Sequence, residues 1–136
     1  MKYLLDSNAW IAHLRQTDPS VTTRLRQEQS SDVVLCSVVL AELHYGALRS
    51  GPVRGVANLA LLAKLRQEYR SLPFDDRAAE ECGEIRNYLA GLGQPIGPND
   101  LMIAAIAKVN GLTVVTHNTS EFSRVPGLPL EDWQIP

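Results

Sequence analysis

Short apolar runs alternate along the chain with longer stretches in which apolar residues recur every three or four positions. The runs at residues 3–5, 33–36 and 112–115 are too short for helices and end in polar residues. Two of them are rich in valine, so we expect buried strands. Two longer segments each place apolar side chains on one helical stripe: Leu59, Leu62, Leu65 and Tyr69, then Leu101, Ala104, Ala105 and Val109.

This pattern predicts strands that alternate with helices. The expected strands span residues 2–6, 33–36, 112–116 and 129–131, and the expected helices span residues 8–15, 19–29, 38–49, 54–70, 75–91 and 99–109. Such an order is typical of an α/β fold with a short, mostly parallel central sheet and helices on both of its faces. No internal repeat or long linker divides the chain, so we expect one domain over residues 1–136.

Composition places the chain among ordinary globular proteins, with 45% hydrophobic and 21% charged residues. Cys36 and Cys82 are too few for a disulfide framework, which fits a reducing cytoplasm. The first apolar run stops after three residues and is too short for a signal peptide or a membrane span. We therefore expect a cytoplasmic protein with no membrane contact.

Charge is segregated along the chain although the net charge is only −2. Five basic residues lie between Arg49 and Arg70 against the single acid Glu68, whereas residues 75–84 hold five acids against Arg77. A protein that coats nucleic acid would carry a global basic excess, so any RNA contact must be local. The segment 49–70 is a candidate RNA-binding surface, and an ordinary solvated helix face is the alternative.

Four polar residues lie where a parallel sheet places its ligand site, just after the strands or at a nearby helix start. These are Asp6, Glu42, Asp100 and Asn118. Each has a simpler explanation on its own. Asp6 or Asp100 can cap a helix, Glu42 can lie on an exposed helix face, and Asn118 can serve a turn.

The conjunction of the three acids points to a metal ion. Carboxylates gathered at one end of a sheet repel one another and raise one another's pKa unless a cation neutralises them. Hard oxygen ligands favour Mg²⁺ or Mn²⁺, and Mg²⁺ usually binds through one or two carboxylates together with water and substrate phosphate.

Four segments, taken in order, resemble the successive motifs of VapC-type ribonucleases of the PIN-domain family. They begin with Tyr3-Leu4-Leu5-Asp6-Ser7-Asn8 and continue with Ser37 to Leu43 followed by Gly46, Ile96 to Ala105, and Val115 to Phe122. Their order and spacing match over essentially the whole chain. The resemblance implies a PIN-like fold and a metal-dependent endoribonuclease, the toxin of a type II toxin–antitoxin system.

The resemblance also implies roles for individual residues. Asp6 and Asp100 become the principal metal ligands, Glu42 the third acid, and Ser7 a hydroxyl that supports them. The family's fourth acidic position falls on Asn118, which is neutral and argues against a fully bound second metal. Glu121 is placed to compensate, although Phe122 indicates that this segment mainly docks on the core.

Partners follow from the same resemblance. A VapB-type antitoxin would wrap the toxin and block its acids, and promoter DNA would be bound only through that antitoxin. Transfer RNA, in particular the initiator species, is the leading substrate. Val56, Ala60 and Ala63 widen the apolar stripe of residues 59–69, which suggests a homodimer or a toxin–antitoxin hetero-oligomer, with plain core packing as the alternative.

Three other readings of the sequence remain. His13, His44 and His117 would have to pair in a metal-free ribonuclease, but single histidines are usually surface or packing residues. A phosphoacceptor signalling domain would need paired acids after the first strand and an acceptor Asp where Ser37 stands. An inactive PIN-like binding module would have little reason to keep three acids together.

Overall fold

Five short strands form one sheet in the order β3-β2-β1-β4-β5, and all of its strand pairs are parallel. The computed structural model describes residues 1–135. The strands are β1 (Tyr3–Leu5), β2 (Val33–Cys36), β3 (Arg70–Leu72), β4 (Thr113–Val115) and β5 (Leu130–Glu131). Because β1 is central, with Leu4 opposite Val34 and Val114, residues that follow β1, β2 and β4 meet at one edge of the sheet.

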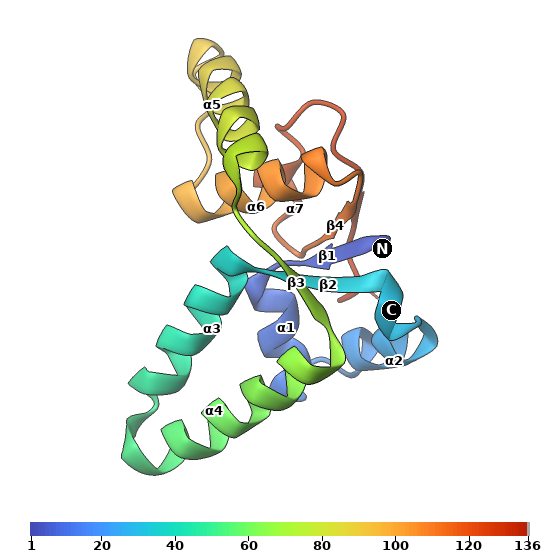
Figure 1. Cartoon of the computed structure of the whole chain (residues 1–136). Coiled ribbons are helices and arrows are strands. Elements are labelled where there is room, and N and C mark those ends of the chain that lie inside the picture. The colour runs from blue at the N-terminus through green and yellow to red at the C-terminus, as the bar shows by residue number, and fades with distance from the viewer. Residues whose placement is uncertain (136) are drawn as a thin grey trace.

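Helices cover both faces of this sheet, as predicted, and Figure 1 shows the two groups on opposite sides. One group contains α1 (Ser7–Leu14), α2 (Pro19–Gln27), α3 (Ser37–Arg49) and α4 (Gly51–Glu68). The other contains α5 (Asp76–Gly91), α6 (Pro98–Val109) and α7 (Thr119–Phe122). A 3₁₀ turn, η1 (Ser30–Asp32), leads into β2.

The core consists of the strands and the helix faces turned toward them. Every residue of β2 is buried, and Leu4 and Leu5 of β1 are fully inaccessible. Ala104, Ala105 and Ile106 of α6 are equally inaccessible. The alanines lack bulky side chains, which lets α6 lie close to the sheet and holds its first turn near the end of β1.

The sequence-based boundaries around α4 were wrong at both ends. The predicted helix 54–70 begins at Gly51, because Gly51 has a φ of +94° and Pro52 follows it in the first helical turn, where its fixed φ is favourable. It ends at Glu68, and Arg70 begins the edge strand β3. Tyr69 is buried against Trp10 at a ring-centroid distance of 5.1 Å. Its apolar character therefore fitted the predicted helical stripe although it lies after the end of the helix.

The predicted apolar stripe separates into buried and exposed residues in the structure. Leu62 and Leu65 belong to the core, whereas Val56 on the same helix is 71% exposed. Core packing therefore accounts for Leu62 and Leu65, and a partner is needed only for the exposed apolar residues. Among the described residues, no helix is both long and apolar enough to cross a membrane.

Candidate active site

Asp6 lies at the end of the central strand and begins helix α1. Its Oδ1 accepts a hydrogen bond of 2.9 Å from the backbone N–H of Ala9, as an N-cap residue does. Its Oδ2 accepts a second bond of 2.6 Å from the Thr116 hydroxyl. Asp6 is only 4% exposed, so its carboxylate is held in one orientation by both the helix and the neighbouring strand end.

Glu42 extends from the second turn of α3 toward the start of α1. Its Oε1 accepts a bond of 2.6 Å from the Ser7 hydroxyl, which joins α3 to α1 directly beside Asp6. Val38, Val39 and Leu43 on the same helix are buried. This packing fixes the orientation of α3, and with it the direction in which Glu42 points.

Asp100 lies in the first turn of α6 and is linked to the segment after β4. The Asn118 Nδ2 group donates to Asp100 Oδ2 at 3.1 Å and to Glu121 Oε2 at 2.6 Å. Glu121 Oε1 accepts the backbone N–H of Gly97 at 2.7 Å. Asn118 is therefore a bridge between two carboxylates, and Glu121 holds the start of α6 while the buried Phe122 docks on the core.

Thr116 is a site residue that we did not identify from the sequence. Besides donating to Asp6, its hydroxyl oxygen accepts the backbone N–H of Asn118 at 2.9 Å. One side chain thus connects the acid after β1 to the segment after β4. Its position directly after a valine-rich strand was the available signal, but threonine is common in strands for packing reasons alone.

Burial and mutual repulsion shift the titration of this cluster. Burial raises the pKa of Asp6, and the charge of Glu42 raises it further although two hydrogen bonds oppose the shift. Burial and the neighbouring Glu121 raise the pKa of Asp100 to about 6. The bonds from Asn118 and Gly97 lower the pKa of Glu121. None of the ion pairs found among residues 1–135 neutralises Asp6, Glu42 or Asp100.

The donor set suits a hard divalent cation, although the acids do not surround one closed site. In the part of the chain that the structure describes, no three His, Cys, Asp or Glu side chains form a ready-made ion cage. Mg²⁺ does not require such a cage, since it keeps several waters and takes one or two carboxylates. A buried acid with no cationic partner, as Asp6 is, fits that demand.

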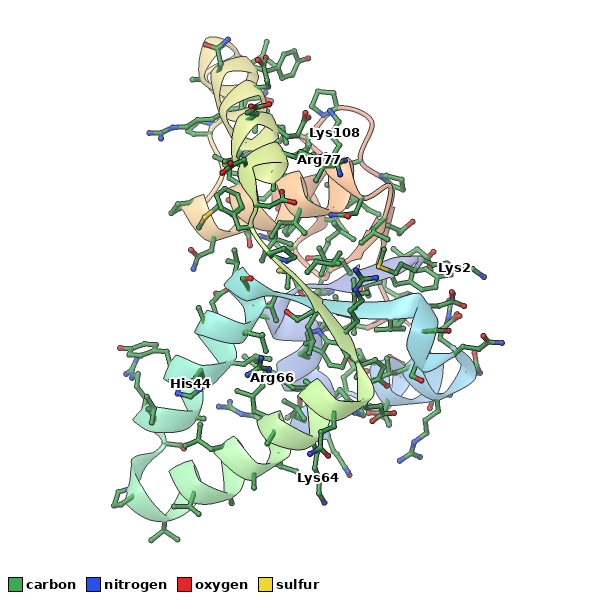
Figure 2. The ribbon with its side chains drawn as sticks, in the orientation of Figure 1. Lys2, His44, Lys64, Arg66, Arg77 and Lys108 are labelled. Carbon is green, nitrogen blue, oxygen red and sulfur yellow. The ribbon has the colours of Figure 1, made fainter. Side chains whose placement is uncertain are left out.

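The three histidines do not pair with one another. His13 Nδ1 contacts the Thr22 hydroxyl at 2.9 Å, and His117 Nδ1 contacts Asp132 at 2.8 Å. His44 lies exposed on α3 (Figure 2). This arrangement gives no support to an acid–base pair of a metal-free ribonuclease.

The basic residues of segment 49–70 belong to three different elements. Arg49 ends α3, Arg70 begins β3, and Lys64 and Arg66 both lie on α4 (Figure 2). Of the other cations, Lys2 lies beside β1, and Arg77 and Lys108 lie in the region of α5 and α6 (Figure 2). RNA binding by this segment stays a prediction.

Comparisons with known proteins agree on one family. A family model described as PIN domain matches residues 3–128. A tRNA(fMet)-specific endonuclease VapC from Shigella flexneri is 42% identical over 134 residues, covering 98% of each chain, and its Salmonella typhimurium counterpart is 39% identical over the same length and coverage. The structure resembles DNA-bound VapBC from Salmonella typhimurium with a TM-score of 0.89 at 37% identity, covering 98% of each chain. It also resembles FitAcB from Neisseria gonorrhoeae, with a TM-score of 0.88 at 28% identity, covering 98% of this chain and 99% of that one.

Proposed function

This chain belongs to the PIN-domain family, among the VapC ribonucleases, and we propose that it is the toxin of a type II toxin–antitoxin pair. Its activity is endonucleolytic hydrolysis of RNA that depends on a divalent cation, with Mg²⁺ as the natural ion and Mn²⁺ as a substitute. We propose that it acts in the cytoplasm, where transfer RNA is found.

One observation carries this proposal. Asp6, Glu42 and Asp100 lie at the carboxyl edge of a parallel sheet, in a chain whose relatives are named as endonucleases. Burial raises the pKa of Asp6 and Asp100, and no cationic side chain of the described residues pairs with either. Such acids are costly for folding alone, and a metal-dependent reaction gives them a use.

We assign the ion to Asp6 and Asp100, with Glu42 completing the acidic cluster. When bound, the ion supplies Lewis acidity toward the phosphate and lowers the pKa of water. The protein's part is orientation: Thr116 fixes Asp6, Ser7 fixes Glu42, and Asn118 fixes Asp100. Glu42 or Asp100 accepts the proton of the attacking water. Because Asn118 is neutral, we infer one tightly held cation rather than two.

The proposed partners are those of its named relatives. We propose initiator transfer RNA as the substrate, after the tRNA(fMet)-specific endonucleases. We propose a VapB-type antitoxin as the protein partner, with promoter DNA bound through that antitoxin, after the DNA-bound VapBC structures. Val53, Val56 and Leu61 on α4 are 84%, 71% and 42% exposed, and such an antitoxin or a second copy of the chain would cover them.

The competing functions find less support in the site. A phosphoacceptor domain needs an acceptor acid after β2, where Ser37 starts α3 instead. An inactive binding module needs no charge at this edge, yet Asp6 is kept ionisable and oriented by two hydrogen bonds.

Neutralising single acids tests the proposal. Asp6→Asn and Asp100→Asn should each abolish Mg²⁺-dependent RNA cleavage and cellular toxicity, exceeding the roughly 10–100-fold loss usual for groups that only support a metal ligand. Asp6→Asn should melt close to the wild type, because asparagine can still cap α1. Asp100→Asn should melt no earlier than the wild type, because it removes a charge that burial and Glu121 disfavour. Asp76→Asn on the exposed start of α5 is the control and should remain fully active. Full activity of Asp100→Asn would refute the assignment.

A further inference from the structure

Three exposed or half-exposed side chains of α3 lie at increasing distance from the acidic cluster: first an acid, then an aromatic ring, then a cation. Glu42 lies at the cluster, Tyr45 follows three residues later, and Arg49 comes four residues after that. Residues at these spacings share one helix face and rise over about 10 Å. Tyr45 is 61% exposed, which is unusual for a large aromatic side chain and is not explained by the core.

An open pocket of about 400 Å³ lies between α3 and α6 along this face. Glu42 and Tyr45 line it from α3, and Asn99 and Met102 line it from α6. The pocket therefore shares one wall with the acidic cluster, since Asn99 also precedes Asp100. Its volume falls in the range of about 300–1,000 Å³ typical of small-ligand sites. The pocket between α1, α3 and α4, which also reaches Glu42, has only about 80 Å³.

We propose that this pocket, the Tyr45 pocket, receives the unstacked base of the nucleotide next to the scissile phosphate. The base stacks on the ring of Tyr45, opposite Met102, and the amide of Asn99 faces its edge. Arg49 binds the next phosphate along the strand. This inference rests on the proposed ribonuclease function and adds to it a binding site for one nucleobase.

The chemistry of the pocket favours a nucleotide over an apolar peptide. Proteins that read single-stranded RNA stack splayed bases on aromatic side chains and guanidinium planes, and they hydrogen-bond the base edges. The Arg49 guanidinium carbon lies 5.6 Å from the centre of the Tyr45 ring, so a cation and an aromatic surface are already adjacent. An apolar peptide side chain would match the ring but leave the arginine and the asparagine without a role.

The shared wall with the acidic cluster also determines which nucleotide the pocket can receive. A base in this pocket has its own phosphate beside Glu42, because Glu42 forms the wall that pocket and cluster share. Bases farther along the strand would reach Arg49 only after passing Tyr45. The site therefore selects the nucleotide adjoining the cut rather than a distant one.

The test combines protein variants with altered RNA. A synthetic RNA stem–loop carrying the cleavage site mapped in tRNA(fMet) is prepared intact and with an abasic nucleotide on either side of the cut. Tyr45→Ala should lower kcat/KM on the intact RNA by about 5- to 150-fold, the equivalent of one lost stacking contact. Tyr45→Phe keeps the ring and should retain cleavage. His44→Ala, which removes the exposed neighbour outside the pocket, is the matched control.

The abasic RNAs make the assignment specific. One of the two should be cut more slowly by the wild type, by at least the factor that Tyr45→Ala costs on intact RNA, because the missing base also loses its contacts with Asn99 and Met102. Tyr45→Ala should lose no more than about 2-fold further on that RNA, because the contact is already gone. If the losses from Tyr45→Ala and from the abasic nucleotide multiply, the base does not contact Tyr45, and the proposal is overturned.

Two further outcomes would also overturn it. If neither abasic RNA slows the wild type, no adjacent base is bound. If Tyr45→Ala leaves RNA cleavage unchanged but weakens antitoxin binding, the pocket serves the antitoxin. In both cases RNA cleavage by the wild type keeps the proposed function intact, whereas a wild type that cuts no RNA with Mg²⁺ would end both proposals.

Discussion

Asp100 must be ionised to bind a metal ion, yet its surroundings in the folded protein disfavour the ionised form. It is half-buried and faces Glu121, which raises its pKa to about 6 from an ordinary value of 3.8. A carboxyl whose pKa is raised in the folded state stabilises the fold only while protonated. Its contribution is therefore complete below about pH 4 and is lost as the pH rises through about 6.

We predict that Asp100→Asn makes the metal-free protein more stable than the wild type at pH 7.5 but not at pH 4. Partial exposure screens the cost, so we expect a gain of about 1 kcal/mol, or about 3–5 °C in Tm. Saturating Mg²⁺ should raise the Tm of the wild type more than that of the variant. Calorimetry with EDTA and with Mg²⁺ at the two pH values measures this, and identical pH profiles would contradict it.

At this scale the sequence located the acids and two of the residues that hold them, Ser7 and Asn118, but not the third, Thr116. Asp6, Glu42 and Asp100 could be predicted because charged residues beside buried strands are costly and so stand out. Thr116 could not, because its hydrogen bond to Asp6 spans 110 residues and leaves no local signal. Tyr45 could not either, because only the structure shows that it is exposed, lines a pocket with Glu42 and lies beside Arg49.

Two glycines inside helices differ in how closely a neighbouring helix approaches them. A Cβ added at Gly55 of α4 would lie 3.1 Å from the carbonyl oxygen of Ala47 in α3, whereas nothing lies within 4 Å of a Cβ at Gly83 in α5. Gly55 therefore permits the tight packing of α3 on α4. Gly83 only weakens its own helix.

We predict opposite outcomes for alanine at these positions. Gly83→Ala should stabilise the protein by about 0.5–1 kcal/mol, because glycine carries that helix cost without a packing benefit. Gly55→Ala should gain nothing or destabilise, because backbone atoms must move apart. Urea unfolding of both variants decides the matter, and an equal gain at both positions would show that α3 and α4 are not in close contact.

Two elements that the sequence missed, β3 and α7, are short and largely polar. β3 is only Arg70–Leu72, at the edge of the sheet and exposed at Arg70, so it lacks the apolar run that marked β1, β2 and β4. α7 has four residues and forms because it docks Phe122 in the core. Tertiary contacts rather than local preference create both elements, and those contacts cannot be read from periodicity.

For the whole molecule, the route of hydrolysis is decided by which groups are available. Water that attacks phosphorus in line leaves a 5′-phosphate and a 3′-hydroxyl, whereas attack by the ribose hydroxyl leaves a cyclic phosphate and a 5′-hydroxyl. We predict 5′-phosphate ends and complete inhibition by EDTA, because the histidines do not pair and the acids gather at one edge. End-specific ligation of the fragments checks this, and 5′-hydroxyl ends from EDTA-treated protein would contradict it.

The bond between Thr116 and Asp6 also sets when this protein becomes dangerous to the cell that makes it. The residue that orients the first acid is synthesised 110 residues after it. At about 5–20 residues per second, a ribosome needs several seconds to cover that distance. Throughout that interval the nascent chain lacks β4, Thr116 and Asn118, so no oriented acidic cluster exists on it. We therefore expect a nascent chain to lack ribonuclease activity until β4 and the segment that carries Thr116 and Asn118 have been made.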